Sequence, residues 1–151
     1  MTTMRTPSKV ASIFLLITVC NVAAYAETLQ LITLEESNLP AGTATKLRGP
    51  FAGPVIEVVT PPSDVAQKTP VKFFIRFKSL SGSAVDIESV RLIYIKTPLI
   101  ELTERVRPFI TPTGIQLSSA DVPPGDHLIR IQLKDAVGRT AAAYANFSVR
   151  Q

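Results

Sequence analysis

From Val55 onward, apolar residues recur at every second position, and this period of two is the feature that most constrains the fold. The segment 71–78 shows it best, with apolar residues at 71, 73, 75 and 77 and mostly charged residues between them. Successive side chains of a β-strand point to opposite faces of a sheet, so the pattern predicts a half-buried strand. An amphipathic helix needs an apolar period of 3.6, which this part of the chain lacks.

The same reasoning predicts about seven short strands in all from Val55 to the end of the chain. They cover residues 55–59, 71–78, 90–96, 102–110, 115–117, 128–134 and 141–149. Turn signals rich in Pro, Gly and Asp separate them, as at 60–62, 123–126 and 135–138. Pro108 places the fourth strand at a sheet edge, because proline has no N–H for a ladder. Short strands joined by such turns favour an all-β fold, a two-sheet sandwich of immunoglobulin (Ig) or fibronectin-III type spanning residues 55–151.

The first 26 residues have the three parts of a cleavable signal peptide in the right order. Arg5 and Lys9 make the start positive, residues 10–19 are apolar, and A-Y-A at 24–26 supplies the small side chains that signal peptidase requires. The apolar run is shorter than the roughly 20 residues needed to cross a bilayer. We therefore expect a periplasmic or secreted protein with no stable membrane span after cleavage.

Cleavage changes the composition of the chain. The only cysteine, Cys20, leaves with the signal, so the mature chain can form neither a disulfide nor a Cys-ligated metal site. Loss of Arg5 and Lys9 leaves 14 basic against 12 acidic residues, and the net charge falls from +4 to +2. No Lys/Arg block is present, so we expect no nucleic-acid partner. A chain of about 125 residues can bury enough surface to fold without cross-links.

Residues 27–54 form an N-terminal tail that shows no sustained period and contains several Pro and Gly residues. Thr33 and Glu36 have the spacing of a capping box, which predicts a short helix that ends before Pro40. Two interpretations stay open. The tail is either mobile or folded back on its own domain, or it is a docking peptide for a partner.

The last predicted hairpin carries a family resemblance. P-P-G-D-H at 123–127, an alternating strand, D-A-V-G at 135–138 and a closing F-S-V at 147–149 are similar to the final hairpin of bacterial Ig-like domains. The similarity covers residues 55–150, and the whole chain resembles small exported bacterial proteins without an assigned activity. It implies a β-sandwich, but says little about function because such domains serve many purposes.

Few residues suit catalysis or metal binding. His127, the only histidine, is expected on the inward face at the start of a strand, hydrogen-bonded to backbone. A general base needs a nucleophile within reach, and the sequence neighbour Asp126 points to the opposite face. Four aspartates are expected to form turns rather than a calcium loop: Asp64, Asp121, Asp126 and Asp135. We predict no catalytic residue, no metal site and no cofactor.

The segment 96–112 is rich in both charged and large apolar residues, which is unusual for a simple loop. A connection between the two sheets explains this composition, and a partner-binding edge is the alternative, since a partner strand can pair with an edge. Phe74, which faces outward by alternation, is expected beside it, covered by the tail or by a partner. The candidate partner-binding residues are Phe74, Lys96, Glu101, Glu104, Arg105 and Arg107.

The sequence therefore favours a non-catalytic, exported Ig-like module that binds a protein partner in the cell envelope, as an accessory component of a larger assembly. The alternative is a sandwich that binds a small molecule or glycan through its end loops. The absence of tryptophan weakens the glycan interpretation, because sugar recognition commonly uses aromatic platforms.

Overall fold

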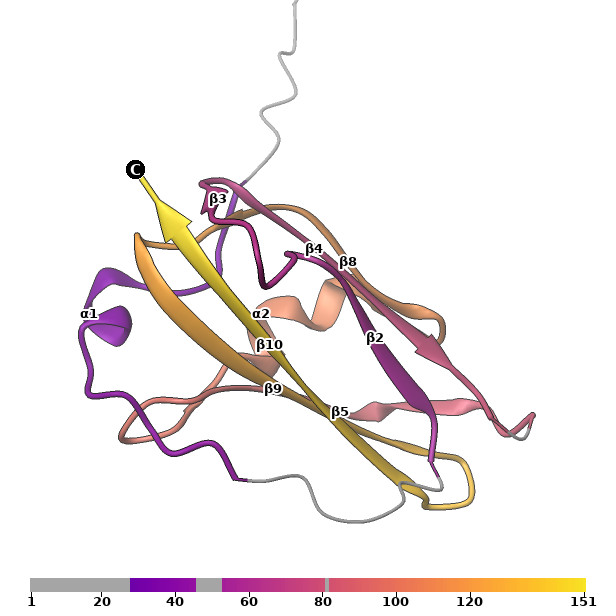
Figure 1. The fold of residues 1–151 in the computed structure, drawn as a ribbon. Helices are drawn as coiled ribbons and strands as arrows, with labels where there is room; N and C mark the ends of the chain where they lie inside the picture. Colours follow the sequence, from indigo (N-terminus) through magenta and orange to yellow (C-terminus); the bar gives the residue numbers. More distant parts are fainter. Residues whose placement is uncertain (1–27, 46–52, 81) are drawn as a thin grey trace, which may run out of the picture.

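The computed structural model describes residues 28–45, 53–80 and 82–151, and the predicted signal peptide lies outside them. Two five-stranded sheets carry the fold (Figure 1). The first sheet contains β1 (Leu29–Gln30), β8 (Gly114–Asp121), β4 (Val71–Lys78) and β2 (Val55–Thr60) in that order, with β7 (Ile110–Thr111) also paired to β8. The second sheet contains β3 (Gln67–Lys68), β10 (Thr140–Arg150), β9 (Gly125–Asp135), β5 (Val85–Tyr94) and β6 (Ile100–Glu101) in that order.

The predicted alternation is confirmed in the central strands. In β4 the side chains at 71, 73, 75 and 77 are buried, and those between them are exposed or half-buried. In β9 the buried side chains include His127, Ile129, Ile131 and Leu133. Each sheet therefore turns one apolar face inward.

The core lies between the inward faces of the two sheets. The rings of Phe73 in β4 and Phe147 in β10 meet edge to face, with centroids 5.2 Å apart and planes at 81°. This is a favourable geometry for an aromatic pair. The all-β composition and the shared core are compatible with the predicted sandwich.

Residues 28–45 fold back onto the two sheets. β1 pairs in parallel with the end of β8, and Leu31 and Ile32 are each 1% exposed within the main core. The capping box is confirmed: the Thr33 amide donates to a Glu36 carboxylate oxygen at 2.9 Å, and the Glu36 amide donates to the Thr33 hydroxyl at 3.2 Å. Helix α1 (Leu34–Ser37) follows directly.

The prediction of a strand over 102–110 is wrong. The chain forms helix α2 (Thr103–Val106), then the 3-10 helix η1 (Arg107–Phe109), and only then the short strand β7. Leu102 and Val106, both buried, are four residues apart, which places them on one side of a helical turn. Pro108 lies in the first turn of η1, where no amide donor is needed.

Two turns show why particular residues are needed. Asp135 accepts hydrogen bonds from the amides of Val137 and Arg139, which confirms it as a turn-forming aspartate. Gly138 follows it with φ of 84°, a conformation that suits glycine. At the start of β8, a Cβ on Gly114 would lie 2.1 Å from the Ile75 carbonyl oxygen, so only glycine fits.

Candidate functional site

The six candidate residues are distributed over both sheets. Phe74 lies in β4 of the first sheet, and Glu101 lies in β6 of the second. Lys96 follows β5, while Glu104 and Arg105 lie in α2 and Arg107 begins η1. Their environments fall into three groups, and the largest hollow that borders any of them, about 490 Å³, lies at Phe74, against about 160 Å³ at Lys96.

Lys96 and Arg105 hold the N-terminal segment. The Lys96 ammonium donates to the carbonyl oxygens of Ser37 at 2.7 Å and Leu39 at 3.1 Å, which are end groups of α1 and the turn after it. The Arg105 guanidinium donates to the Leu31 carbonyl at 2.8 Å and to both carboxylate oxygens of Glu36. These contacts use both cations inside the protein, so neither is presented to a partner in this arrangement.

Glu104 and Arg107 pair with each other at the surface, at 2.6 Å, and Arg107 also contacts Glu88 at 3.0 Å. The hydrogen bonds with Arg107 hold the pKa of Glu104 below its ordinary value. Glu101 contacts Arg91 at 3.5 Å. Exposed ion pairs of this kind contribute little to stability and separate readily.

Phe74 is the centre of a groove on the outer face of the first sheet. The pairing register places Thr60 of β2, Phe74 of β4 and Gln116 of β8 in one row across three strands. Lys72 and Ser118 also border this hollow, which has a volume of about 490 Å³. We call it the Phe74 groove, lined by the side chains of Thr60, Lys72, Phe74, Gln116 and Ser118.

The charges around the groove are mostly positive. Arg76 lies over the Phe74 ring, with its guanidinium carbon 5.3 Å from the ring centroid. Glu57 in β2 contacts Lys78 at 2.8 Å and Arg76 at 3.2 Å, and these cations, Lys78 above all, lower the pKa of its carboxyl. Lys72 has no ion pair with any residue in the described part of the chain.

A buried hydroxyl lies at the side of the groove. Thr60 Oγ1 is shielded from solvent and has no hydrogen-bond partner among residues 28–45, 53–80 and 82–151. Buried polar atoms in folded proteins are nearly always paired, so an orphan hydroxyl beside a groove needs an explanation. Because the oxygen is shielded, a ligand in the Phe74 groove could bond to it only after the surrounding side chains had moved.

His127 has both ring nitrogens occupied inside the core. Its Nε2 lies 2.8 Å from the Pro123 carbonyl oxygen, which can only accept, so Nε2 carries the hydrogen. Nδ1 is then an acceptor, and the Tyr94 hydroxyl donates to it at 2.9 Å. The inward position and backbone bond expected from the sequence are confirmed, and neither nitrogen is free to take a proton from a substrate.

Burial favours the neutral forms of both His127 and Tyr94. It lowers the pKa of His127, chiefly because the charged imidazolium would lose its hydration. Burial and the nearby Glu36 carboxylate together raise the pKa of Tyr94 to about 12. A neutral tyrosine donating to a neutral imidazole is thus the stable arrangement at pH 7.

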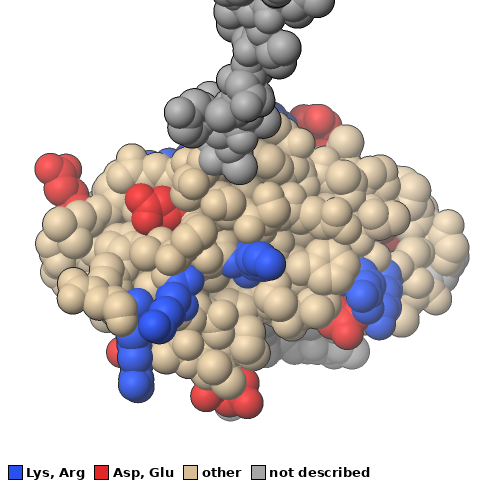
Figure 2. Space-filling model, turned by 90° about the horizontal axis from the view of Figure 1, so that it is seen from above, with Lys and Arg blue, Asp and Glu red and all other residues tan. Residues whose placement is uncertain are grey.

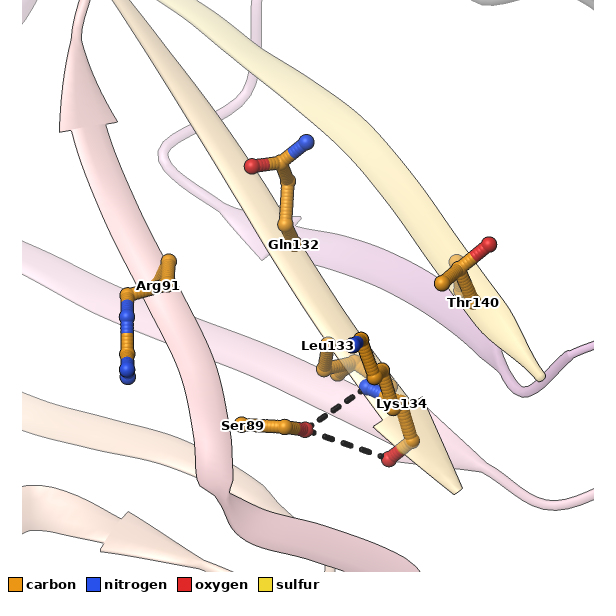
Figure 3. A pocket seen from close by; sticks show the side chains of 7 residues that line it. Ser89, Arg91, Gln132, Leu133, Lys134 and Thr140 are labelled. Carbon is orange, nitrogen blue, oxygen red and sulfur yellow. Dashed lines mark hydrogen bonds between the residues drawn. The ribbon is translucent and has the colours of Figure 1, made fainter. Parts of the chain in front are cut away.

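A second hollow, of about 290 Å³, lies on the second sheet where β5 bulges away from β9 (Figure 3). The Ser89 hydroxyl bridges the gap, since it donates to the Asp86 carbonyl at 2.6 Å and accepts from the Lys134 amide at 2.7 Å. Arg91, on its border, donates to the carbonyls of Glu88 and Val90. These side chains supply hydrogen bonds where the bulge interrupts the backbone hydrogen bonds between β5 and β9. The bulge therefore explains the hollow without a ligand.

On the face that Figure 2 shows, which is the top of the molecule as drawn in Figure 1, basic and acidic side chains are interspersed between broad uncharged areas. Among the described residues, no three His, Cys, Asp or Glu side chains gather closely enough to hold a metal ion. The helices in that part of the chain are too short to cross a bilayer.

Comparison with models of known protein families, with curated proteins and with solved structures found no match. The chemistry of the site must therefore be argued from the residues of this chain alone.

The sequence predicts the outward position of Phe74 but gives no indication that Thr60 and Gln116 lie beside it. Alternation along β4 is visible in the sequence and places Phe74 outward. The row across the sheet depends on which strands pair and in which register, and a one-residue shift would send every side chain to the other face. No signal in the sequence specifies that register.

Proposed function

We propose that this protein is an exported, non-catalytic interaction module of Ig or fibronectin-III type, and that it binds a protein partner of the cell envelope at the Phe74 groove. The observation that carries the proposal is the groove itself. A half-buried aromatic ring stands in the middle of an outward-facing row, next to a lysine that makes no ion pair with any described residue. Aromatic side chains in such settings often dominate the energy of binding.

The strand order supports the Ig or fibronectin-III assignment. In chain order, β2, β4 and β8 take the places of strands A, B and E, and β5, β9 and β10 take those of C, F and G. The short strand β3 pairs in parallel with the end of β10.

The non-catalytic part of the proposal draws on His127. Both of its nitrogens are bonded to protein groups, and the ring packs against Phe147 with centroids 5.4 Å apart. A general base would need one nitrogen free to face a substrate.

Export is proposed from the sequence of residues 1–26 alone. If it is correct, the protein recovered from the periplasm or culture medium begins at Glu27, and its intact mass matches residues 27–151. A protein that keeps Met1 and stays in the cytoplasm would contradict export and, with it, a partner in the cell envelope.

A second candidate function is binding of a small molecule or glycan. It is favoured by a hollow of about 300 Å³ formed by the loop Pro61–Asp64 against Tyr144. Calorimetric titration with neutral and acidic oligosaccharides tests it: heat that is lost in Tyr144→Ala and kept in Phe74→Ala would favour this candidate.

Affinity capture from the envelope of the native cells tests the main proposal. We expect the tagged wild-type protein to retain a specific partner, and Phe74→Ala to retain about tenfold less of it. Val137→Ala is the matched control, because Val137 is 68% exposed in a turn of the other sheet. Equal capture by all three proteins would contradict the proposed site.

A further inference from the structure

We propose that the Phe74 groove binds an extended acidic segment of its partner, with a carboxylate at Lys72 and an apolar side chain on the Phe74 ring. This inference rests on the proposed function and specifies the chemistry of the partner. It commits to a peptide segment, and the alternatives of a membrane surface or a small molecule are separated by the test below.

Charge complementarity selects an acidic occupant. The outward positions of β4 carry Lys72, Arg76 and Lys78, and opposite them on β2 the only carboxylate is Glu57. Glu57 already contacts Arg76 and Lys78, so Lys72 is the one of these three cations that has no ion pair with a described residue. A carboxylate at Lys72 would balance this excess.

The uncharged polar groups select an extended peptide backbone. The side chains of Gln116 and Ser118 are exposed beside Phe74 and make no hydrogen bond to any other described residue. Both lie on β8, the strand next to Phe74. An extended chain laid along β8 offers a donor and an acceptor at each residue, and so can bond to both side chains.

The shape of the surface favours a peptide over a membrane. Phe74 is half-buried in a hollow and is partly covered by Arg76, so it does not project as an interfacial anchor does. A peptide side chain can enter the hollow and pack on the ring. Bilayer lipids instead require apolar groups that protrude from the protein surface.

Selection from a library of random twelve-residue peptides tests the inference, with the whole exported protein immobilised. We expect the enriched peptides to contain Asp or Glu next to an aromatic or aliphatic residue. Selected peptides should bind Lys72→Glu and Phe74→Ala at least about tenfold more weakly than wild type. Lys134→Glu, an exposed cation on the other sheet, is the matched control and should bind as wild type does.

Two results would overturn the inference. One is enrichment of neutral or basic peptides, or of acidic peptides that bind Lys72→Glu as tightly as wild type. The other is co-sedimentation of the protein with vesicles of anionic phosphatidylglycerol that Lys72→Glu abolishes, with no acidic peptide enriched. Failure of the proposed function is distinguishable, because then the selected peptides bind Phe74→Ala and wild type equally well. Circular dichroism of each variant verifies that it is folded.

Discussion

Glu36 and Arg105, 69 residues apart in the sequence, are joined by two hydrogen bonds of 2.6 and 2.8 Å between carboxylate and guanidinium. The same carboxylate accepts from the Thr33 amide, and the same guanidinium donates to the Leu31 carbonyl. One ion pair therefore caps α1 and ties the N-terminal segment to α2. Such paired, two-pronged contacts are stronger and more directional than a single neutral hydrogen bond.

Glu36→Gln should lower the free energy of unfolding by about 1–3 kcal/mol at pH 7, since hydrogen bonds to charged groups are worth about this much. The Arg105 hydrogen bond, with further bonds from Thr33, lowers the pKa of Glu36 from 4.5 to about 2. A depressed carboxyl pKa stabilises the fold above the ordinary value, and the stabilisation is lost as the pH falls through the folded value. Urea unfolding should show the difference between wild type and variant shrinking from pH 4.5 to pH 2.

Glu104→Gln is the control for this measurement, because its ion pair with Arg107 is exposed. We expect little change in stability from it at any pH. A gap between wild type and Glu36→Gln that stays constant down to pH 2 would contradict the assigned role of the Glu36 carboxylate.

Leu31→Ala should destabilise the protein by about 2–5 kcal/mol, the range for truncation of a fully buried leucine. Leu31 is 1% exposed in the shared core, although it precedes the first long strand by more than twenty residues. Leu34→Ala is the matched control, because Leu34 is 63% exposed on α1 and its loss should cost less than about 0.5 kcal/mol. Chemical denaturation compares them, and equal stabilities would mean that the segment does not belong to the core.

His127 should give the fold a pH dependence below its ordinary pKa of 6.5. Burial lowers the pKa of the folded imidazole, so the unfolded chain binds a proton that the folded chain resists. Stability is therefore fully present above pH 6.5 and falls as the pH drops. Imidazole NMR signals report this directly, because His127 is the only histidine. His127→Gln should remove this part of the dependence, and a folded-state pKa at or above 6.5 would disprove the account.

The parts of the fold that follow local rules could be predicted from the sequence. Alternation placed Phe73 inward and Phe74 outward, the capping box marked the start of α1, and Asp135 identified a turn. Each depends on residues close in the chain.

The parts that could not be predicted depend on long-range pairing. Leu31 and Ile32 form too short an apolar segment to indicate which surface covers them, and the row from Thr60 to Gln116 exists only in one register. The sequence does not predict α2 because the helix has only four residues, Thr103–Val106, and its apolar spacing rests on a single pair, Leu102 and Val106. So short a pattern does not distinguish the helical period of 3.6 residues from the strand period of two.

The most direct test of the account is photo-cross-linking in the living cell, with p-benzoylphenylalanine in place of Phe74 in one strain and in place of Gln132 in another. Gln132 borders the hollow on the opposite sheet and serves as the matched position (Figure 3). If a partner binds at the Phe74 groove, position 74 gives one defined protein adduct and position 132 gives none. Adducts only from position 132, or from neither position in a correctly folded protein, would contradict it.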